Sequence, residues 1–471
     1  MIIGRSRPST DSARSGQLPG RLAHLSLPRQ VLALSVWPLL EQLMSFMVGV
    51  VDLALAGHLQ PADTAVAAAD AIGVGGFFSW LMMIIQSAVG IGATALIARA
   101  VGGRHRGLAH AALAQSMLLA LAVGAALAAA MFLTASTLAT VTGLKGLGQS
   151  WCAIYLRILA AAAPFSALLL IGNAALRGAG DTRTPFAVMV VVNVVNIAVS
   201  ALLVYGPEPF GGHGVRGIAS GTVIAWFIGA ILILARLMRR GGVIRLHWHR
   251  LRPHWHTLRR IVRVGLPNMF ESVVGMWFGN FVVVMIVGRI ADQAVLGAHQ
   301  TVIRIEAVSF LPGFAMGIAA STLVGQYLGM GDAVRARRAA NLCWLYGAAI
   351  MVAMGILFMA VPHWLVGLIT TAEPLLELAP TPLRICGPFQ IFLATQIVLA
   401  GALRGAGDTR ATMWMTLVSM FLVRVPAAWL LAIPAGLGLN GIWIAMGIEM
   451  FVRAALFAWR FMSNRWAEVR V

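Results

Sequence analysis

The sequence predicts an all-α polytopic membrane protein with twelve transmembrane helices in two pseudo-symmetric six-helix bundles. Hydrophobic residues make up 59% of the 471 residues and charged residues only 11%, whereas about 25% of a soluble domain is charged. Most apolar runs also exceed the roughly 18 residues that cross a bilayer. The third observation is an internal repeat of nearly half the chain, which requires two similar halves.

The repeat is exact over nine residues. The stretch 175–183 reads ALRGAGDTR, and the stretch 402–410 reads the same. The interval is 227 residues (402 − 175). A Leu-Arg-Ile tripeptide at 156–158 recurs at 383–385 with the same interval. The chain is therefore predicted to be a duplicated unit of roughly 230 residues.

The apolar segments give six predicted spans in each half. In the first half they lie near 31–56, 66–98, 107–133, 151–174, 184–205 and 215–238. In the second half they lie near 265–288, 294–328, 339–366, 380–402, 411–433 and 440–462. The predicted domains are a disordered cytoplasmic tail at 1–28, an N-terminal bundle at 29–238, a cytoplasmic linker at 239–263, a C-terminal bundle at 264–462 and a cytoplasmic tail at 463–471.

The loops between the spans alternate in charge. One set, which includes both tails and the linker, holds most of the arginines, whereas the opposite loops hold only Lys145, Arg216 and Arg289 as cations. Cationic loops stay in the cytoplasm. We therefore expect a multi-pass protein of the bacterial plasma (inner) membrane with both termini cytoplasmic. The net charge of +19 then reflects topology, and no nucleic-acid partner is expected.

Cysteine and histidine patterns argue against disulfides and metal sites. Cys152, Cys343 and Cys386 lie in apolar segments without paired spacing. The linker carries His-Trp-His at 247–249 and at 254–256, but an i, i+2 spacing puts the two histidines of each pair on different helix faces. The linker is instead predicted to be a basic interfacial helix with its tryptophans at the headgroup level.

The repeated motif follows the fourth predicted span of each half. Its glycines allow a left-handed helix stop, its aspartate can cap the next helix, and its first arginine suits a helix C-terminus. We predict a cytoplasmic elbow that is either structural or part of an inner gate. The residues concerned are Arg177, Gly178, Gly180 and Asp181, and then Arg404, Gly405, Gly407 and Asp408.

Several further motifs accompany the elbow in a fixed order. They are Val51-Asp52 followed by Ala56-Gly57, Gly265-Leu266-Pro267, Ala298-His299-Gln300 and Leu323-Val324-Gly325-Gln326. With the elbows, they make residues 30 to 462 resemble the multidrug and toxic compound extrusion (MATE) transporters of the NorM/DinF type. The resemblance implies two bundles in a V shape around a central cavity, with ion-driven export by alternating access.

Acidic residues inside membrane spans are costly and are usually functional. Six fall within the predicted spans: Glu41, Asp52, Asp70, Glu271, Glu306 and Glu449. Glu41 and Asp52 are 11 residues apart, about three helical turns, and so share one face of the first span. We predict that both face the cavity and couple transport to ions or protons; the alternative is a carboxylate capped by a neighbouring hydroxyl or amide. The resemblance also gives Asp52 an ion- or proton-binding role.

Other candidate cavity or substrate residues are Asn193, Asn196, Ser200, Glu271, Gln390 and Gln396. Ser200 stands where the family pattern of span five has an aspartate, and span ten has no acid. The first departure weakens the transfer of the family's proton site in the N-terminal half, and the second that of its sodium site in the C-terminal half. Glu41 and Asp52 together favour H+ as the coupling ion, Na+ is the alternative, and no other cofactor is expected. Arg304 is a candidate partner that would make Glu271 structural. Glu449 and Arg453 form a structural i, i+4 pair by spacing.

The predicted function is secondary antiport of cationic or amphipathic drugs and toxic compounds, by a monomer among membrane lipids. One alternative is a lipid-linked saccharide flippase of the same superfamily, which would have a more cationic cavity. A more distant alternative is a membrane-embedded enzyme. The sequence has no Walker glycine loop, His-Glu-x-x-His or Gly-x-Ser-x-Gly motif, so no enzymatic activity is expected.

Overall fold

The computed structural model describes residue 18 and residues 22–59, 61–207, 209–290 and 293–469. Within them, twelve helical runs are long and apolar enough to cross a membrane, which confirms the predicted class and span number. The first six are α1 (Leu27–Gly57), α2 (Ala62–Gly102), α3 (Arg106–Val141), α4 (Gly146–Gly178), α5 (Arg183–Tyr205) and α6 (Gly214–Met238).

The second half repeats this order with more interruptions. Its first span is continuous through α7 (Trp255–Phe270), the π-helical η3 (Glu271–Phe278) and α8 (Gly279–Val287). The next are α9 (Gln293–Gly329) and α10 (Ala333–Ala360), followed by the short α11 (Pro362–Gly367) and α12 (Glu373–Leu378). The last are α13 (Pro380–Ala406), then α14 (Thr409–Val418) with the π-helical η4 (Ser419–Arg424) and α15 (Val425–Ala432), and finally α16 (Gly438–Met462).

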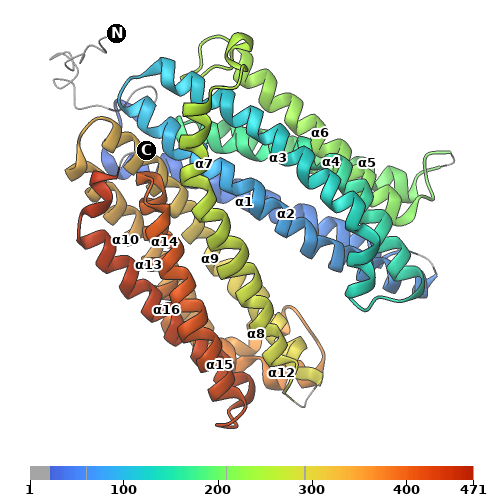
Figure 1. Ribbon diagram of the computed structural model, residues 1–471. Helices are drawn as coiled ribbons and strands as arrows, with labels where there is room; N and C mark the ends of the chain where they lie inside the picture. Colours follow the sequence, from blue (N-terminus) through green and yellow to red (C-terminus); the bar gives the residue numbers. More distant parts are fainter. Residues whose placement is uncertain (1–17, 19–21, 60, 208, 291–292, 470–471) are drawn as a thin grey trace.

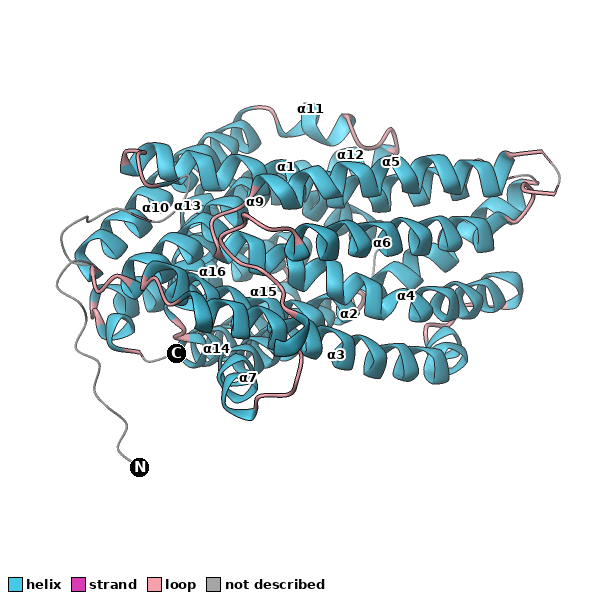
Figure 2. Cartoon of the chain, turned by 90° about the horizontal axis from the view of Figure 1, so that it is seen from above, coloured by secondary structure: helices cyan, strands magenta, loops and turns pink. Residues whose placement is uncertain are grey.

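The two halves form two bundles in a V. Figure 1 shows α1 to α6 in one arm and α8 to α16 in the other, and the arms join at one end and diverge toward the other. Contacts between the arms come mainly from α1 and α2 on one side and from α7 and α9 on the other. Figure 2 shows the same helices from above.

At the joined end, α2 and α9 cross with their backbones in contact. A Cβ atom added at Gly102 would overlap the carbonyl oxygen of Gln326, and one added at Gly329 would overlap that of Arg99. The side chain of Gln326 also donates a hydrogen bond to Gly178 O (3.0 Å) at the elbow of the first half. This crossing fastens the two arms together at one end only.

The elbows have the predicted left-handed glycines, at Gly180 (φ +89°) and Gly407 (φ +88°). The predicted cap is present in the first elbow, where Asp181 Oδ1 accepts a hydrogen bond from Thr184 N (3.2 Å). In the second elbow the prediction is wrong, because the Asp408 side chain makes no cap hydrogen bond. It accepts instead from Arg460 Nε at 2.7 Å.

The predicted basic helix forms over only the last part of the linker. The prediction is wrong for residues 239–254, which are non-helical apart from a three-residue 3-10 turn, η2 (Trp248–Arg250), whereas residues 255–263 are helical as the start of α7. Gln115 of α3 binds the backbone of the linker. Its side chain donates a hydrogen bond to Arg250 O (3.0 Å) and accepts one from His254 N (3.0 Å). In the described part of the chain, no three His, Cys, Asp or Glu side chains are grouped to hold a metal ion.

Parts of both tails pack against the second half. Residues 1–17 and 19–21 of the predicted disordered tail lie outside the described residues. Leu18 and Leu22, however, are buried in a core cluster with residues of the second half. At the other end, Trp466 of η5 (Arg465–Glu468) stacks on Phe461 with ring centroids 5.1 Å apart.

Candidate functional site

Asp52 lies where three helices of the first half meet. Its side chain, on α1, is buried, with only 4% of the residue exposed. Thr222 of α6 donates its hydroxyl to Asp52 Oδ2 (3.0 Å), and Asn196 of α5 donates its amide to Oδ1 (3.4 Å). The same amide donates to Thr222 Oγ1 at 3.0 Å. A buried carboxylate needs such donors, because leaving it unpaired in an apolar interior is costly.

The hydrogen-bond partners of Asp52 are neutral groups, and one acceptor beside it is unused. Asn196 Oδ1 is buried without a hydrogen-bond partner. A protonated Asp52 could donate to this oxygen after a half-turn of the amide, since an amide presents an acceptor on one side and donors on the other. The cluster of Asp52, Asn196 and Thr222 can therefore satisfy either protonation state without breaking an ion pair.

The other two predicted residues of α5 do not contact the carboxylate. Asn193 donates to Met189 O of its own helix (2.9 Å). Ser200 donates to Ile218 O of α6 (3.4 Å), so it joins two helices at the position where the family pattern has an aspartate. Of the three candidates in span five, Asn196 is the one that forms a hydrogen bond with Asp52.

Glu41 is buried on the same helix as Asp52 but has a cationic partner. Its Oε1 lies 2.6 Å from Arg177 Nη1, at the start of the first elbow, and 3.4 Å from Asn173 Nδ2. Glu41, a predicted coupling residue, is therefore engaged in an ion pair. The pair links α1 to the end of α4.

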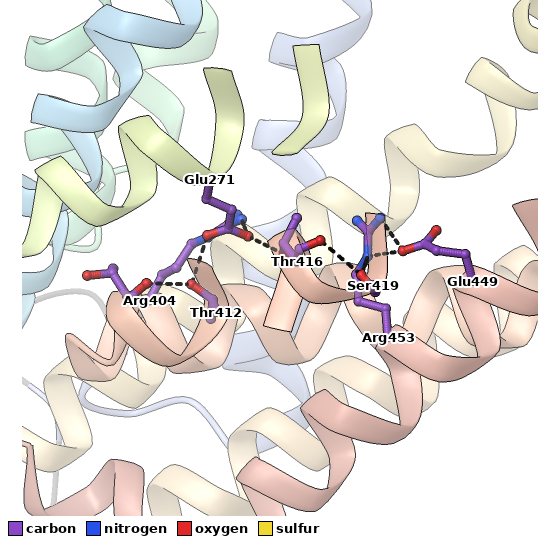
Figure 3. A network of polar contacts seen from close by, with 8 residues as sticks. Glu271, Arg404, Thr412, Thr416, Ser419, Glu449 and Arg453 are labelled. Atoms are coloured by element: carbon purple, nitrogen blue, oxygen red, sulfur yellow. Dashed lines mark hydrogen bonds and ion pairs between the residues drawn. The ribbon is translucent and has the colours of Figure 1, made fainter. Parts of the chain in front are cut away.

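Glu271 makes the equivalent pair in the second half. Arg404 of the second elbow lies 2.8 Å from Glu271 Oε1, and the carboxylate also accepts from Thr412 (2.8 Å) and Thr416 (2.9 Å). Figure 3 shows these side chains converging on Glu271. The suggested partner Arg304 is wrong, since it is exposed on α9. Each half thus ties its first span to its own elbow arginine.

The second half contains a further charged network. Glu449 pairs with Arg453, as its spacing predicts, and with Arg424 at 3.0 Å. Arg453 Nε donates to Ser419 (3.1 Å), which brings the network next to the Glu271 group (Figure 3). Glu271, Ser419 and Arg424 all lie in the two π-helical segments, a feature that is frequent at functional sites. Glu271 and Glu449 are therefore both paired with guanidinium groups.

Two more candidates, Glu306 and Gln390, lie in a separate buried group. Glu306 accepts from Cys386 Sγ (3.3 Å), and Gln390 donates to the same sulfur (3.0 Å). Ser309 donates to Gln390 Oε1 at 2.8 Å. Gln396 is also buried in α13, whereas Asp70 is exposed.

Sequence reasoning missed several residues of these groups. Thr222 had no signal, because nothing in its spacing links it to Asp52. The elbow ion pairs did have a sequence signal. Spans one and seven each contain a glutamate, and each elbow contains an arginine, so an ion pair in one half implies an ion pair in the other. The missed residues are Asn173, Thr222, Thr412, Thr416, Ser419 and Arg424.

Known proteins share this sequence pattern. The chain is 29% identical over 442 residues to a probable multidrug resistance protein NorM of Thermotoga maritima, with 93% of each chain covered. It is 25% identical to an uncharacterized transporter YisQ of Bacillus subtilis, covering 92% of this chain and 94% of that one. Both relatives span nearly the whole chain.

Known structures share the fold. A crystal structure of a MATE protein in a bent conformation matches with a TM-score of 0.86 and 21% identity, over 94% of this chain and 98% of that one. A MOP superfamily transporter from Pyrococcus furiosus matches with a TM-score of 0.86 and 20% identity, over 95% and 98%. The sequence model of the MatE family matches residues 39–202 and 267–430, one segment in each half. The chain therefore belongs to the MatE family of membrane transporters and is not an enzyme.

Proposed function

We propose that this transporter exports cationic or amphipathic organic compounds by alternating access, in exchange for H+ bound at Asp52. It would do so in a bacterial inner membrane with both termini in the cytoplasm. The export of drugs is supported by the relative in Thermotoga maritima, which is a probable multidrug resistance protein. The coupling ion is inferred from the polar groups of the first half.

The observation that carries the proposal is that the hydrogen-bond donors around Asp52 are neutral. The buried acids that pair with arginine lack this feature, and buried Glu306 shares it only with the weaker thiol donor of Cys386. Glu41, Glu271 and Glu449 each contact at least one guanidinium group, so protonating any of them would break an ion pair. Asp52 is hydrogen-bonded by a hydroxyl and an amide, and Asn196 Oδ1 is free to accept from its protonated form. Asp52 is thus the acid best placed to gain and lose a proton during a transport cycle.

The arrangement of the arms supports alternating access. In a cycle of this kind the joined end must separate while the splayed end closes. At the joined end, α2 contacts α9 around Gly102 and Gly329 and contacts α7 around Gly92 and Gly265, and these are the contacts that would have to open. Protonation of Asp52 would change how α1, α5 and α6 contact one another, and α1 also packs against α9 of the other arm.

The experiment is transport by purified protein in liposomes under an imposed pH gradient or an imposed Na+ gradient. A fluorescent organic cation reports export. We expect the pH gradient alone to drive it and Asp52→Asn to abolish it, with normal insertion of the variant. Asp70→Asn, which alters an exposed acid, is the matched control and should transport normally.

Two outcomes would contradict the proposal. If a Na+ gradient drives export and a pH gradient does not, the coupling ion is wrong. If Asp52→Asn keeps full export driven by the pH gradient, coupling lies elsewhere. Glu306, which accepts a hydrogen bond from the thiol of Cys386, then becomes the next candidate.

A further inference from the structure

A groove runs along the outer face of the first bundle. It has a volume of about 550 Å³ and lies over α4, between α3 and α6. Helix α4 also packs against α2, and α2 contacts the second half. The groove is lined by α3, α4 and α6 and not by α2, so it lies away from the junction of the two halves. It is lined by Phe132, Arg157, Ile158, Ala161, Ser220, Val223 and Ile224.

One cation stands in this otherwise apolar groove. Arg157 is exposed on α4, donates to Ser136 Oγ at 2.7 Å and lies 6.0 Å from the centre of the Phe132 ring. None of the ion pairs found among the described residues includes it. A charged side chain on a membrane-facing surface is costly without an anionic partner.

The depth of Arg157 brings it within reach of lipid headgroups. It lies 11 residues after Gly146 (157 − 146), or about 16 Å along α4 at 1.5 Å per residue. The 33 residues of α4 span about 50 Å, which exceeds the hydrocarbon core of about 30 Å by about 10 Å at each end. Arg157 is then about 6 Å inside the hydrocarbon boundary, a distance that a long arginine side chain can bridge.

The second half provides an internal comparison. Arg384 stands at the repeated position (157 + 227) and is exposed as well. There, however, the ring of Phe389 packs directly onto Gly447 of α16, leaving no space even for a Cβ atom. The first half has Ala162 at the position of Phe389 (389 − 227). The second half thus has a bulky ring packed between α13 and α16 where the first half has only a methyl group.

We propose that this groove binds one anionic phospholipid, with its phosphate at Arg157 and an acyl chain along Ile158, Ala161 and Val223. Arginine suits this role because its guanidinium matches a phosphate with paired hydrogen bonds. An anionic headgroup is preferred over a zwitterionic one because no carboxylate lines the groove to balance an amine. The lipid lies in the leaflet at the end of the bundle away from the elbows, and its binding does not depend on which ion drives transport.

The test is native mass spectrometry of the purified protein after delipidation and addition of phosphatidylglycerol or phosphatidylcholine. We expect one retained phosphatidylglycerol per chain. Arg157→Gln should lower its affinity about tenfold, as expected for loss of a charge-assisted hydrogen bond. Arg384→Gln is the matched control and should bind like the unaltered protein.

A second variant addresses the groove rather than the charge. Ala161→Phe, at an exposed position, fills the groove while keeping Arg157, and should lose the lipid to a similar degree. The proposal is overturned if both variants retain the lipid, if Arg384→Gln loses it equally, or if phosphatidylcholine binds as tightly. Inorganic phosphate supplies a further test. The proposal is also overturned if phosphate alone displaces the lipid and binds Ala161→Phe with the same affinity as the unaltered protein, because the ligand would then be the free ion.

Discussion

Gly102 and Gly329 are 227 residues apart (329 − 102) and make reciprocal contacts across the junction of the two arms. Gly102 lies against the backbone of Gln326, and Gly329 lies against the backbone of Arg99. Arg99 and Gln326 are separated by the same interval (326 − 99). The pseudo-twofold axis that relates the halves therefore passes through this crossing, and each half supplies the same two backbone groups to it.

A methyl group at either glycine should force the arms apart. We expect Gly102→Ala and Gly329→Ala each to lengthen the distance between spin labels at residues 107 and 334, which are exposed at the starts of α3 and α10. Double electron–electron resonance measures that distance. Gly76→Ala, in the same α2 but with open space around its Cβ, is the control. An unchanged distance in both junction variants would show that the contact does not close this end.

The duplicated ion pairs should contribute strongly to stability. Arg404→Gln leaves Glu271, which is 1% exposed, as an unpaired buried charge, a change that typically costs about 3–5 kcal/mol. The double variant Glu271→Gln/Arg404→Gln should recover part of the loss. Arg335→Gln breaks a partly exposed pair with Asp332, where about 0–1 kcal/mol is expected. Thermal unfolding in detergent compares the three, and equal losses for Arg404→Gln and Arg335→Gln would contradict the argument.

The hydroxyl of Thr222 should matter for coupling more than for folding. Thr222→Val keeps the shape but removes the donor to Asp52 Oδ2, and an unpaired buried group costs about 1–3 kcal/mol. We expect this variant to insert normally and to lose most export driven by a pH gradient, whereas Thr222→Ser keeps it. Export in liposomes is the measurement. Equal rates for the valine and serine variants would mean that the hydroxyl has no role.

The inferred orientation can be checked by labelling single cysteines in intact cells. At the side opposite the arginine-rich loops, Gln149 lies in the first turn of α4, and exposed Glu373 begins α12. Cysteines at both positions should react with a membrane-impermeant maleimide added from outside. Reaction only after permeabilisation would reverse the inferred topology. A cysteine at exposed Arg337, near the start of α10 on the arginine-rich side, is the control with the opposite expectation.

The sequence predicted the fold because each span is encoded locally. Length and apolarity are enough to place α1 or α9 in a membrane, and the repeat relates the halves without any knowledge of contacts. Local signals failed where tertiary contacts decide the structure. The linker has helix-like composition, yet Gln115 of α3 binds its backbone in a non-helical path. Asp408 has the spacing of a cap, yet Arg460 takes its carboxylate.

The candidate site was predictable only in part for the same reason. An acid such as Asp52 is conspicuous in an apolar span, so it can be found from the sequence alone. A threonine is common in apolar helices, so Thr222 becomes informative only when the packing of α6 on α1 places its hydroxyl 3.0 Å from the carboxylate. The partner of Glu271 depends on which arginine the fold brings close. Arg304 lies in the next span along the chain, but the folded structure places Arg404 beside the carboxylate.

The crossing of α2 and α9 also bears on how such a protein diversifies. Its closest contacts are made by main-chain atoms at glycines, and main-chain atoms are the same whatever side chains surround them. Substitutions on the walls of the two arms can therefore accumulate without altering this crossing. The crossing and the side chains that line the arms are under separate constraints, so a lineage can vary those side chains while keeping the geometry of the junction.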